Sequence, residues 1–358
     1  MNSIISILQN ESIVFEIRVK ILCLMQNLSI RSTILLDFMI EKNYVNILEN
    51  YFTETPCVEE NPIPYILSML IDQKYPDIDL FKRYLQNLED SWISYTKEIS
   101  YLIRKFITTV ENPVETFIEI FSPNFHFSVS DGKEDALNLF IFLCEAADHQ
   151  IIQIFFENND IPHLFDESST IAEKMLIFQL ITVAVPKLNE DNISKIFSEK
   201  FMSDSVELVK RGHVELQRSF IIMFDACLNC FSADLKNSVI KKKVIHVIIR
   251  FLTNEDQETI EIALKSLLGL LNFTILNFPN LINADLMSLD MIFNEYSLKN
   301  VFEEIESSDE LNFENVGPLI NEINECIEKY IDIANINAKN TPVLDVSSDY
   351  ISDYEDFI

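Results

Sequence analysis

Residues 136–165 read ALNLFIFLCEAADHQIIQIFFENNDIPHLF, and this stretch decides the class of fold. Its first part, Ala136–Ala147, is apolar on nearly every face of a helix. A helix of that kind must be buried on several sides, and its length and charged residues do not suit a membrane span. The stretch therefore predicts a helix that lies inside a packed array of helices.

Runs of this kind recur along the chain. Residues 171–185 form another, and successive runs are about forty residues apart, rising to the mid-forties late in the chain. Such a period is typical of helical repeats, in which each unit buries its apolar face only against the next. We expect buried helices centred near Asn27, Leu67, Lys105, Cys144, Thr182, Leu228 and Asn272.

Helix starts are well marked, and strand signals are weak. Asn112-Pro113 places a proline at a first helical position, Thr170 with Glu173 has the spacing of a capping box, and Asp160 precedes a further start. The chain has only 4 glycines, too few for the turns of a large β-protein or for phosphate-binding loops. Composition and pattern together predict an all-α protein.

The net charge is −30, from 57 acidic and 27 basic residues in a chain of 358. A surface of this sign repels nucleic acid and anionic lipid, so we expect neither nucleic acid nor a membrane as a direct partner. A partner protein with a basic surface, or a basic peptide, fits better. The charge is equally well explained as keeping an apolar-rich scaffold in solution. We expect no cofactor, and a monomer when the chain is on its own.

Three segments resemble the armadillo family. Residues 136–165 resemble one unit, in which a buried third helix, a turn and a helix lead into a Gly-x-Ile-Pro-x-Leu entry, with Asn159 where the family often has glycine. Ile21–Ser29 resembles the third-helix motif Leu-x-x-Leu-x-Asn-Leu-Ser, and Ala263–Phe273 matches it more loosely. The resemblance implies a right-handed α-α superhelix, an armadillo/HEAT-like solenoid of about six to eight irregular repeats.

We expect the solenoid to span residues 1–300, an acidic capping region residues 301–338, and an acidic disordered tail residues 339–358. The capping region should hold a helix over 318–336 whose apolar face is Leu319, Ile323, Ile327, Tyr330 and Ile331. No signal peptide is recognisable at the N-terminus, and the cysteines form no disulfide framework. These features predict the cytoplasm, the nucleus or both as the location.

Two groups of residues are candidate sites. Lys241, Lys242 and Lys243 with Arg250 form a basic patch that suits an acidic peptide, a phosphate or the chain's own acidic tail, or that is simply a solvated helix start. Ser347, Ser348 and Ser352 lie among acids, as acidophilic-kinase sites do.

No catalytic or metal-binding set is apparent. Cys227 and Cys230 form a C-x-x-C without a second pair, which we interpret as two thiols on one turn of a buried helix. The histidines show no metal-type spacing, and the glycines form no phosphate loop. We therefore expect no enzyme activity, and a deep pocket joining a cysteine or histidine to a carboxylate would revive that class.

The leading functional hypothesis is a non-catalytic scaffold or adaptor that holds a segment of a partner protein. The first alternative is a nuclear transport receptor that resembles the import adaptors, which grip basic peptides with a ladder of Trp and Asn residues. This chain has a single tryptophan, Trp92, and no such ladder. The second alternative is a regulatory subunit of a kinase or phosphatase complex.

Overall fold

The computed structural model describes residues 2–10, 12–52, 62–89, 97–121, 133–168, 170–236, 244–253, 256–277, 298–307 and 313–340. Within these ranges every regular element is a helix and none is a strand, so the predicted all-α class is confirmed. The chain forms two compact units, Met1–Leu235 and Lys236–Ile358, and each is described by itself. The expected boundary at residue 300 stays a prediction.

Fourteen α-helices and two short 3₁₀ helices are described in the first unit. They are α1 (Asn2–Leu8), α2 (Phe15–Arg31), α3 (Ile34–Glu41), η1 (Val45–Tyr51), α4 (Ile63–Asp72), α5 (Ile78–Glu89), α6 (Lys97–Ile107), α7 (Pro113–Phe121), α8 (Lys133–Ala146), α9 (His149–Asn158), α10 (Ile161–Glu167), α11 (Ile171–Ala184), η2 (Val185–Lys187), α12 (Glu190–Ile196), α13 (Glu199–Arg211) and α14 (Val214–Leu228).

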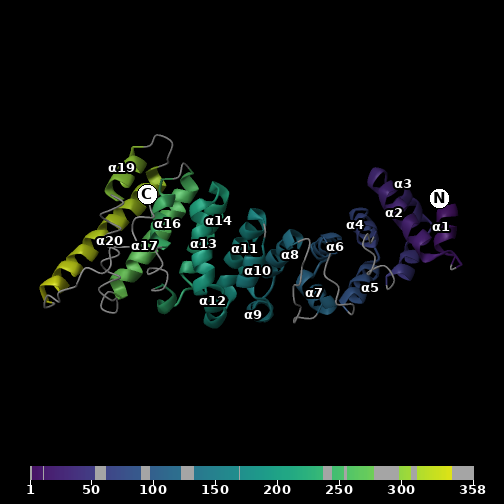
Figure 1. The fold of residues 1–358 in the computed structure, drawn as a ribbon, viewed down its shortest axis with the longest axis horizontal. Helices are drawn as coiled ribbons and strands as arrows, with labels where there is room; N and C mark the ends of the chain where they lie inside the picture. The colour runs from purple at the N-terminus through teal and green to yellow at the C-terminus, as the bar shows by residue number, and fades with distance from the viewer. Residues whose placement is uncertain are drawn as a thin grey trace. The chain divides into compact units, whose positions relative to one another are not determined.

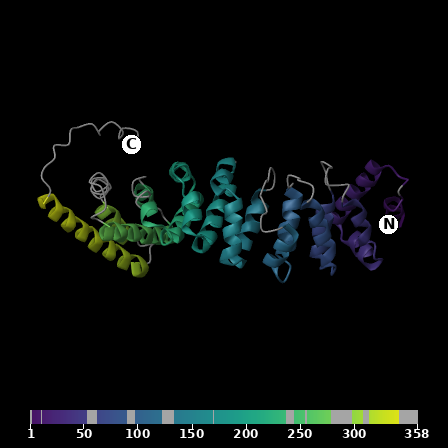
Figure 2. The same cartoon turned by 90° about the horizontal axis from the view of Figure 1, so that it is seen from below.

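Six of these helices form one continuous row. Helix α2 packs on α4, α4 on α6, α6 on α8, α8 on α11, and α11 on α14 (Figures 1 and 2). We call α2, α4, α6, α8, α11 and α14 the inner row. The remaining helices connect its members and cover its back, and α5 packs on α7 as α9 does on α12. Six of the seven predicted centres lie in the inner row and the seventh, Asn272, lies in the second unit, so the repeat is confirmed.

The repeat units change along the row. The pairs α5–α6 and α7–α8 contain two helices each, as HEAT-type units do, whereas α9–α10–α11 and α12–α13–α14 contain three, as armadillo-type units do. The stretch 136–165 therefore covers an inner helix, α8, and the first two helices of the next unit.

Phenylalanine side chains join successive units across the row. Phe178 of α11 is fully buried, with its ring centroid 5.5 Å from that of Phe165 in α10 and 5.7 Å from that of Phe220 in α14. At the boundary with the preceding unit, Phe155 of α9 contacts Phe117 of α7 at 5.8 Å and Phe140 of α8 at 5.7 Å. The contact of Phe178 with Phe220 and both contacts of Phe155 cross from one unit to the next, so each unit completes the core of its neighbour.

Ion pairs between neighbouring units accompany this core. Lys105 Nζ lies 2.6 Å from Asp72, Arg104 Nε 2.9 Å from Asp135, and Lys82 Nζ 2.7 Å from Glu119. Lys200 pairs with Asp166 in the same way. Exposed pairs of this kind contribute about 0–1 kcal/mol each to the free energy of unfolding. Their main effect is therefore on how neighbouring units align with each other.

The C-terminus of α8 is capped by the following unit. Lys187 Nζ donates to the carbonyl oxygens of Cys144, Glu145 and Ala147 at 2.7, 3.1 and 3.0 Å. The carbonyl oxygen of Lys187 in turn accepts from the Gln153 amide at 3.1 Å. One side chain thus satisfies three carbonyls that a helix end leaves without intrahelical partners.

The predicted helix starts are confirmed where the structure describes them. Thr170 and Glu173 form the capping box of α11, and the Asp160 side chain accepts from the backbone N–H of His163 at the start of α10. Asn159, at the position where armadillo units often have glycine, has a φ of −124°. That conformation needs no glycine, and the Asn159 amide donates to the Phe155 carbonyl at 2.8 Å.

Four α-helices are described in the second unit: α16 (Val244–Phe251), α17 (Gln257–Asn277), α19 (Leu298–Glu306) and α20 (Phe313–Asn340). Helix α17 packs on both α16 and α20. The helix predicted over 318–336 corresponds to α20 and is longer than predicted, because it begins at Phe313 and ends at Asn340.

The apolar face predicted for this helix was partly wrong. Its buried side chains include Val316, Ile320, Ile323 and Cys326, whereas Leu319 is only half-buried. The face is rotated because the helix packs along α17, where Cys326 Sγ lies 3.3 Å from Asn272 Oδ1.

No single helix among the described residues is both long enough and apolar enough to cross a membrane. Taken together, α2 and α3 meet the length and composition test, but they are bent by 113° relative to each other.

Replacing Phe178 with alanine should destabilise the first unit by about 3–5 kcal/mol, because a fully buried ring that joins three helices is lost. Urea denaturation followed by circular dichroism measures this. The matched change Ile171→Ala, at a side chain that is 42% exposed on the same helix, should cost below about 1 kcal/mol. Equal costs for the two changes would contradict the role assigned to Phe178.

Candidate functional site

Each interior helix of the inner row has two buried flanks and one exposed stripe. The stripe follows the three-to-four-residue spacing of one helix face, as in Glu134, Asn138 and Glu145 of α8. Neighbouring inner helices cover the flanks and the connecting helices cover the back, so these stripes share the remaining side. We call this surface the row face, and its members include Tyr65, Asp72, Glu98, Tyr101, Lys105, Glu134, Asn138, Glu145, Gln179, Glu215 and Arg218.

A groove of about 310 Å³ crosses the row face where α2, α3, α4 and α6 meet. This volume is at the lower end of the range for ligand sites, and it suits a few side chains of a bound segment. The groove is lined by Ser29, Ile30, Thr33, Leu36, Tyr65, Ser68, Met69, Asp72, Gln73, Tyr101 and Lys105.

One wall of the groove is a cluster of charges around Tyr101. Lys105 Nζ lies 5.2 Å from the centre of the Tyr101 ring, and Arg104 Cζ lies 5.7 Å from it. Lys105 is also paired with Asp72 at 2.6 Å, and Arg104 with Asp135. The two cations are therefore engaged by carboxylates of the protein, while Tyr65, which also lines the groove, is 36% exposed.

The groove also borders a polar group without a partner. The Ser29 hydroxyl is buried and forms no hydrogen bond among the described residues. The neighbouring Ser68 hydroxyl, by contrast, donates to the Tyr65 carbonyl at 2.8 Å. Since buried polar groups are nearly always satisfied, Ser29 is a hydrogen-bonding group that a bound molecule or water can complete.

The row face carries more acids than bases. Its exposed carboxylates are Asp72, Glu98, Glu134, Glu145 and Glu215, and its cations are the half-buried Arg104, Lys105 and Arg218. This excess makes the surface complementary to a segment with Lys or Arg side chains.

Two exposed asparagines of the inner row bond within their own helices. Asn27 Nδ2 donates to the Cys23 carbonyl at 3.0 Å, and Asn138 Nδ2 to the Glu134 carbonyl at 2.7 Å. Both amides thus bond to their own helix. Trp92 lies outside the described residues.

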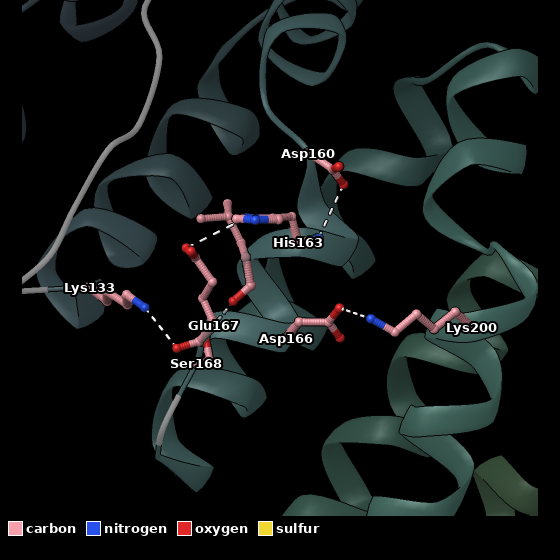
Figure 3. A network of polar contacts seen from close by, with 8 residues as sticks. Lys133, Asp160, His163, Asp166, Glu167, Ser168 and Lys200 are labelled. Carbon is pink, nitrogen blue, oxygen red and sulfur yellow. Dashed lines mark hydrogen bonds and ion pairs between the residues drawn. The ribbon is translucent and has the colours of Figure 1, made fainter.

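A second polar region surrounds α10, and Figure 3 shows its contacts. Lys133 of α8 donates to the Glu167 carbonyl at 2.9 Å, and Asp166 pairs with Lys200 of α13. His163 Nδ1 lies 3.6 Å from the Glu167 carboxylate on the same helix. The network joins three successive units through one short helix, which is a structural role.

A hollow of about 630 Å³ lies beside this network, between α10, α11, α13 and α14. Its cations are engaged: Arg211 lies 2.7 Å from Glu207, and Lys174 Nζ lies 4.4 Å from the centre of the Phe165 ring. The cations of the hollow, like Lys105 and Arg104 at the groove, are thus engaged within the protein.

The sequence-predicted sites fall mostly outside the described residues. Lys241, Lys242 and Lys243 are among these, as are Ser347, Ser348 and Ser352. Arg250 is described, and it is exposed in the last turn of α16. The basic patch and the phosphorylation sites therefore remain predictions.

The described cysteines form no disulfide with one another. Cys227 is buried in the last turn of α14, and Cys230 follows two residues after the helix ends, half-buried. Burial raises the pKa of the Cys144 thiol to about 12 and also raises the pKa of Cys227. Within the described residues, no three His, Cys, Asp or Glu side chains are grouped as metal ligands.

These thiols should differ in reactivity. At pH 8 a thiol with a pKa of about 12 is ionised in only about one molecule in ten thousand, so Cys144 should resist alkylation, as should Cys227. The half-buried Cys23 and Cys230 should react with iodoacetamide before Cys144 and Cys227 do, and mass spectrometry of the digested protein measures the order. In the unfolded chain these thiols ionise as the pH rises above about 9, whereas in the folded protein burial keeps them protonated. The free energy of unfolding should therefore fall as the pH rises above about 9. Rapid labelling of Cys144 in the folded protein would contradict this.

Comparison with known proteins gave structural matches only. No protein-family model matches the sequence, and no curated protein matches it. A designed armadillo repeat protein is similar in structure, with a TM-score of 0.51, 13% identity, and coverage of 69% of this chain and 98% of that one. The crystal structure of an engineered protein from a structural genomics consortium matches with a TM-score of 0.55 at 10% identity, covering 91% of this chain and 87% of that one. The chain therefore has the armadillo/HEAT type of helical-repeat fold.

Proposed function

We propose that the protein is a non-catalytic scaffold whose row face holds a segment of a partner protein that carries basic side chains. The observation that carries this proposal is the groove at Tyr65 and Tyr101, set in a face with five exposed carboxylates. Carboxylates attract Lys and Arg, and an exposed tyrosine ring adds about 0.5–1 kcal/mol for a cation above it.

The geometry suits an elongated ligand more than a small molecule. Inner helices repeat the same exposed stripe, so acidic groups recur along the row from Asp72 to Glu215. A segment lying across the row would meet one helix after another, and the groove would take its anchoring side chain. Multiple weak contacts of this kind give selectivity through their spacing.

The cysteine chemistry supports a binding role over a nucleophilic one. The thiolate is the nucleophilic form, and burial disfavours it at both Cys144 and Cys227. Free thiols also fit a reducing compartment, so the proposal includes the cytoplasm or the nucleus as the location.

The test is an affinity pull-down of the tagged full chain from its own cell extract, read by mass spectrometry at low and high salt. The triple variant Tyr65→Ala/Glu98→Gln/Glu134→Gln should lower recovery of a stoichiometric basic partner about tenfold, because it removes one anchor and two charges. The matched control Glu115→Gln/Glu157→Gln neutralises two exposed acids on the connecting helices α7 and α9 and should leave recovery unchanged.

High salt should also release the partner, since exposed charges are screened. The proposal fails if no stoichiometric partner is recovered at either salt concentration. It also fails if the control variant loses the partner as completely as the row-face variant does, because the acids would then act only through net charge.

A further inference from the structure

Helix α2 has an exposed apolar stripe that the row face does not include. Val14, directly before the helix, is 60% exposed, Ile17 and Leu24 are 49% exposed, and Leu28 is 42% exposed. With 3.6 residues per turn, Ile17, Leu24 and Leu28 fall on one narrow line along the helix. We call these four residues the terminal stripe.

The terminal stripe faces away from the next helix of the row. Ser29 and Ile30 line the groove shared with α4, and Ile30 lies nearly opposite Ile17 around the helix. The stripe is therefore the flank on which a preceding inner helix would pack. In α8 and α11 that flank is buried by the neighbouring helix, whereas α2 is the first member of the row.

An exposed apolar line of this length is unusual on a protein surface. A contiguous apolar patch of this kind promotes association or marks a contact surface. The terminal stripe has the composition of an interior flank, and this indicates that another element covers it.

The charged residues beside the stripe indicate which charge the covering element should have. Helix α2 has one acidic residue, Glu16, against three basic ones, in a chain whose net charge is −30. Two of the basic residues, Lys20 and Arg31, are exposed along one edge of the stripe, and neither has a polar partner among the described residues. The complementary ligand is an amphipathic helix with one acidic edge.

The chain itself contains a segment with this chemistry. Residues 349–358 read DYISDYEDFI, with four acids and no basic residue. Their apolar residues recur at helical spacing, and Asp349, Asp353 and Asp356 recur along one edge of the same helix. The apolar residues are Tyr350, Ile351, Tyr354, Phe357 and Ile358.

We propose that residues 349–358 of a second copy of this chain bind the terminal stripe of α2 as an amphipathic helix. The five apolar side chains would cover the stripe, and the acidic edge would face Lys20 and Arg31. Ten residues are too few for a stable helix alone in water, so the segment would fold as it binds.

Every copy carries both the stripe and the acidic segment, so two copies can associate through this contact, and the second copy is the source that the experiments test. The association is then head-to-tail, and it does not depend on how the two units of one chain are placed. This proposal departs from the monomer expected from the sequence. It is independent of the proposed function, because it uses the flank of α2 and not the row face.

The first experiment measures the mass of the full chain by sedimentation equilibrium over a range of concentrations. Association should rise with concentration and be lost in Leu24→Asp/Leu28→Asp, which places acids on the stripe. It should equally be lost in Tyr354→Ala/Phe357→Ala. The matched control Ile78→Asp/Ile171→Asp changes side chains that are 48% and 42% exposed elsewhere in the unit, and it should associate like the unchanged chain.

The second experiment titrates a fluorescein-labelled peptide of residues 345–358 with the full chain. Leu24→Asp/Leu28→Asp should weaken binding about fiftyfold or more, because two leucines lose their burial. Lys20→Glu/Arg31→Glu should weaken it about tenfold, and the matched control Lys195→Glu less than twofold. Hydrogen exchange should show protection of residues 15–31 in the presence of the peptide.

Three results would overturn the proposal. The first is a chain that stays monomeric at all concentrations and does not bind the peptide. The second is association that requires the stripe but not Tyr354 and Phe357, which would assign the contact to another surface of the second copy. The third is a monomer whose α2 is protected only when the tail is intact, which would make the chain's own tail the occupant.

Discussion

The whole first unit depends on one constraint, namely that each interior helix of the inner row must bury two apolar flanks. A single neighbour covers only one flank, so α8 and α11 are stable only between the helices before and after them. The ring of Phe178, between Phe165 and Phe220, shows how closely the units share one core. Stability in such an array is a sum over neighbouring pairs, and no unit has a complete core of its own.

This division of surfaces leaves one side of the row free for binding. The flanks and back of each interior helix are buried against other helices, whereas its exposed stripe can hold any residues that are compatible with contact to water. Some charges on this side also join units, as Lys105 and Asp72 do, whereas Glu98, Glu134 and Glu215 are in none of these ion pairs. The carboxylates of Glu98, Glu134 and Glu215 can therefore serve recognition without disturbing the core.

The sequence predicted the parts of the fold that depend on local chemistry. The helices around Cys144 and Thr182 were predicted to be buried because a helix with apolar side chains on nearly every face must be covered on several sides. The start of α11 was predicted because a capping box, here Thr170 with Glu173, is a contact between residues close in sequence. The groove was not predicted, because its residues come from four helices whose relative rotation the sequence pattern does not determine. A usable signal was present in Glu134, Asn138 and Glu145, polar residues at helical spacing within an apolar run. The face of α20 was misjudged for a related reason, since its rotation is determined by α17.

The three hydrogen bonds from Lys187 to the end of α8 have a consequence for local opening. Lys187 belongs to the short turn that follows α11, so the last turn of α8 keeps its cap only while the next unit stays folded. Fraying cannot remain confined to one unit here, because loosening the turn after α11 exposes carbonyls one unit earlier. A ligand that holds α11 in place would thereby tighten α8 as well, and ordering would spread backward along the row without any contact to the helix that gains it.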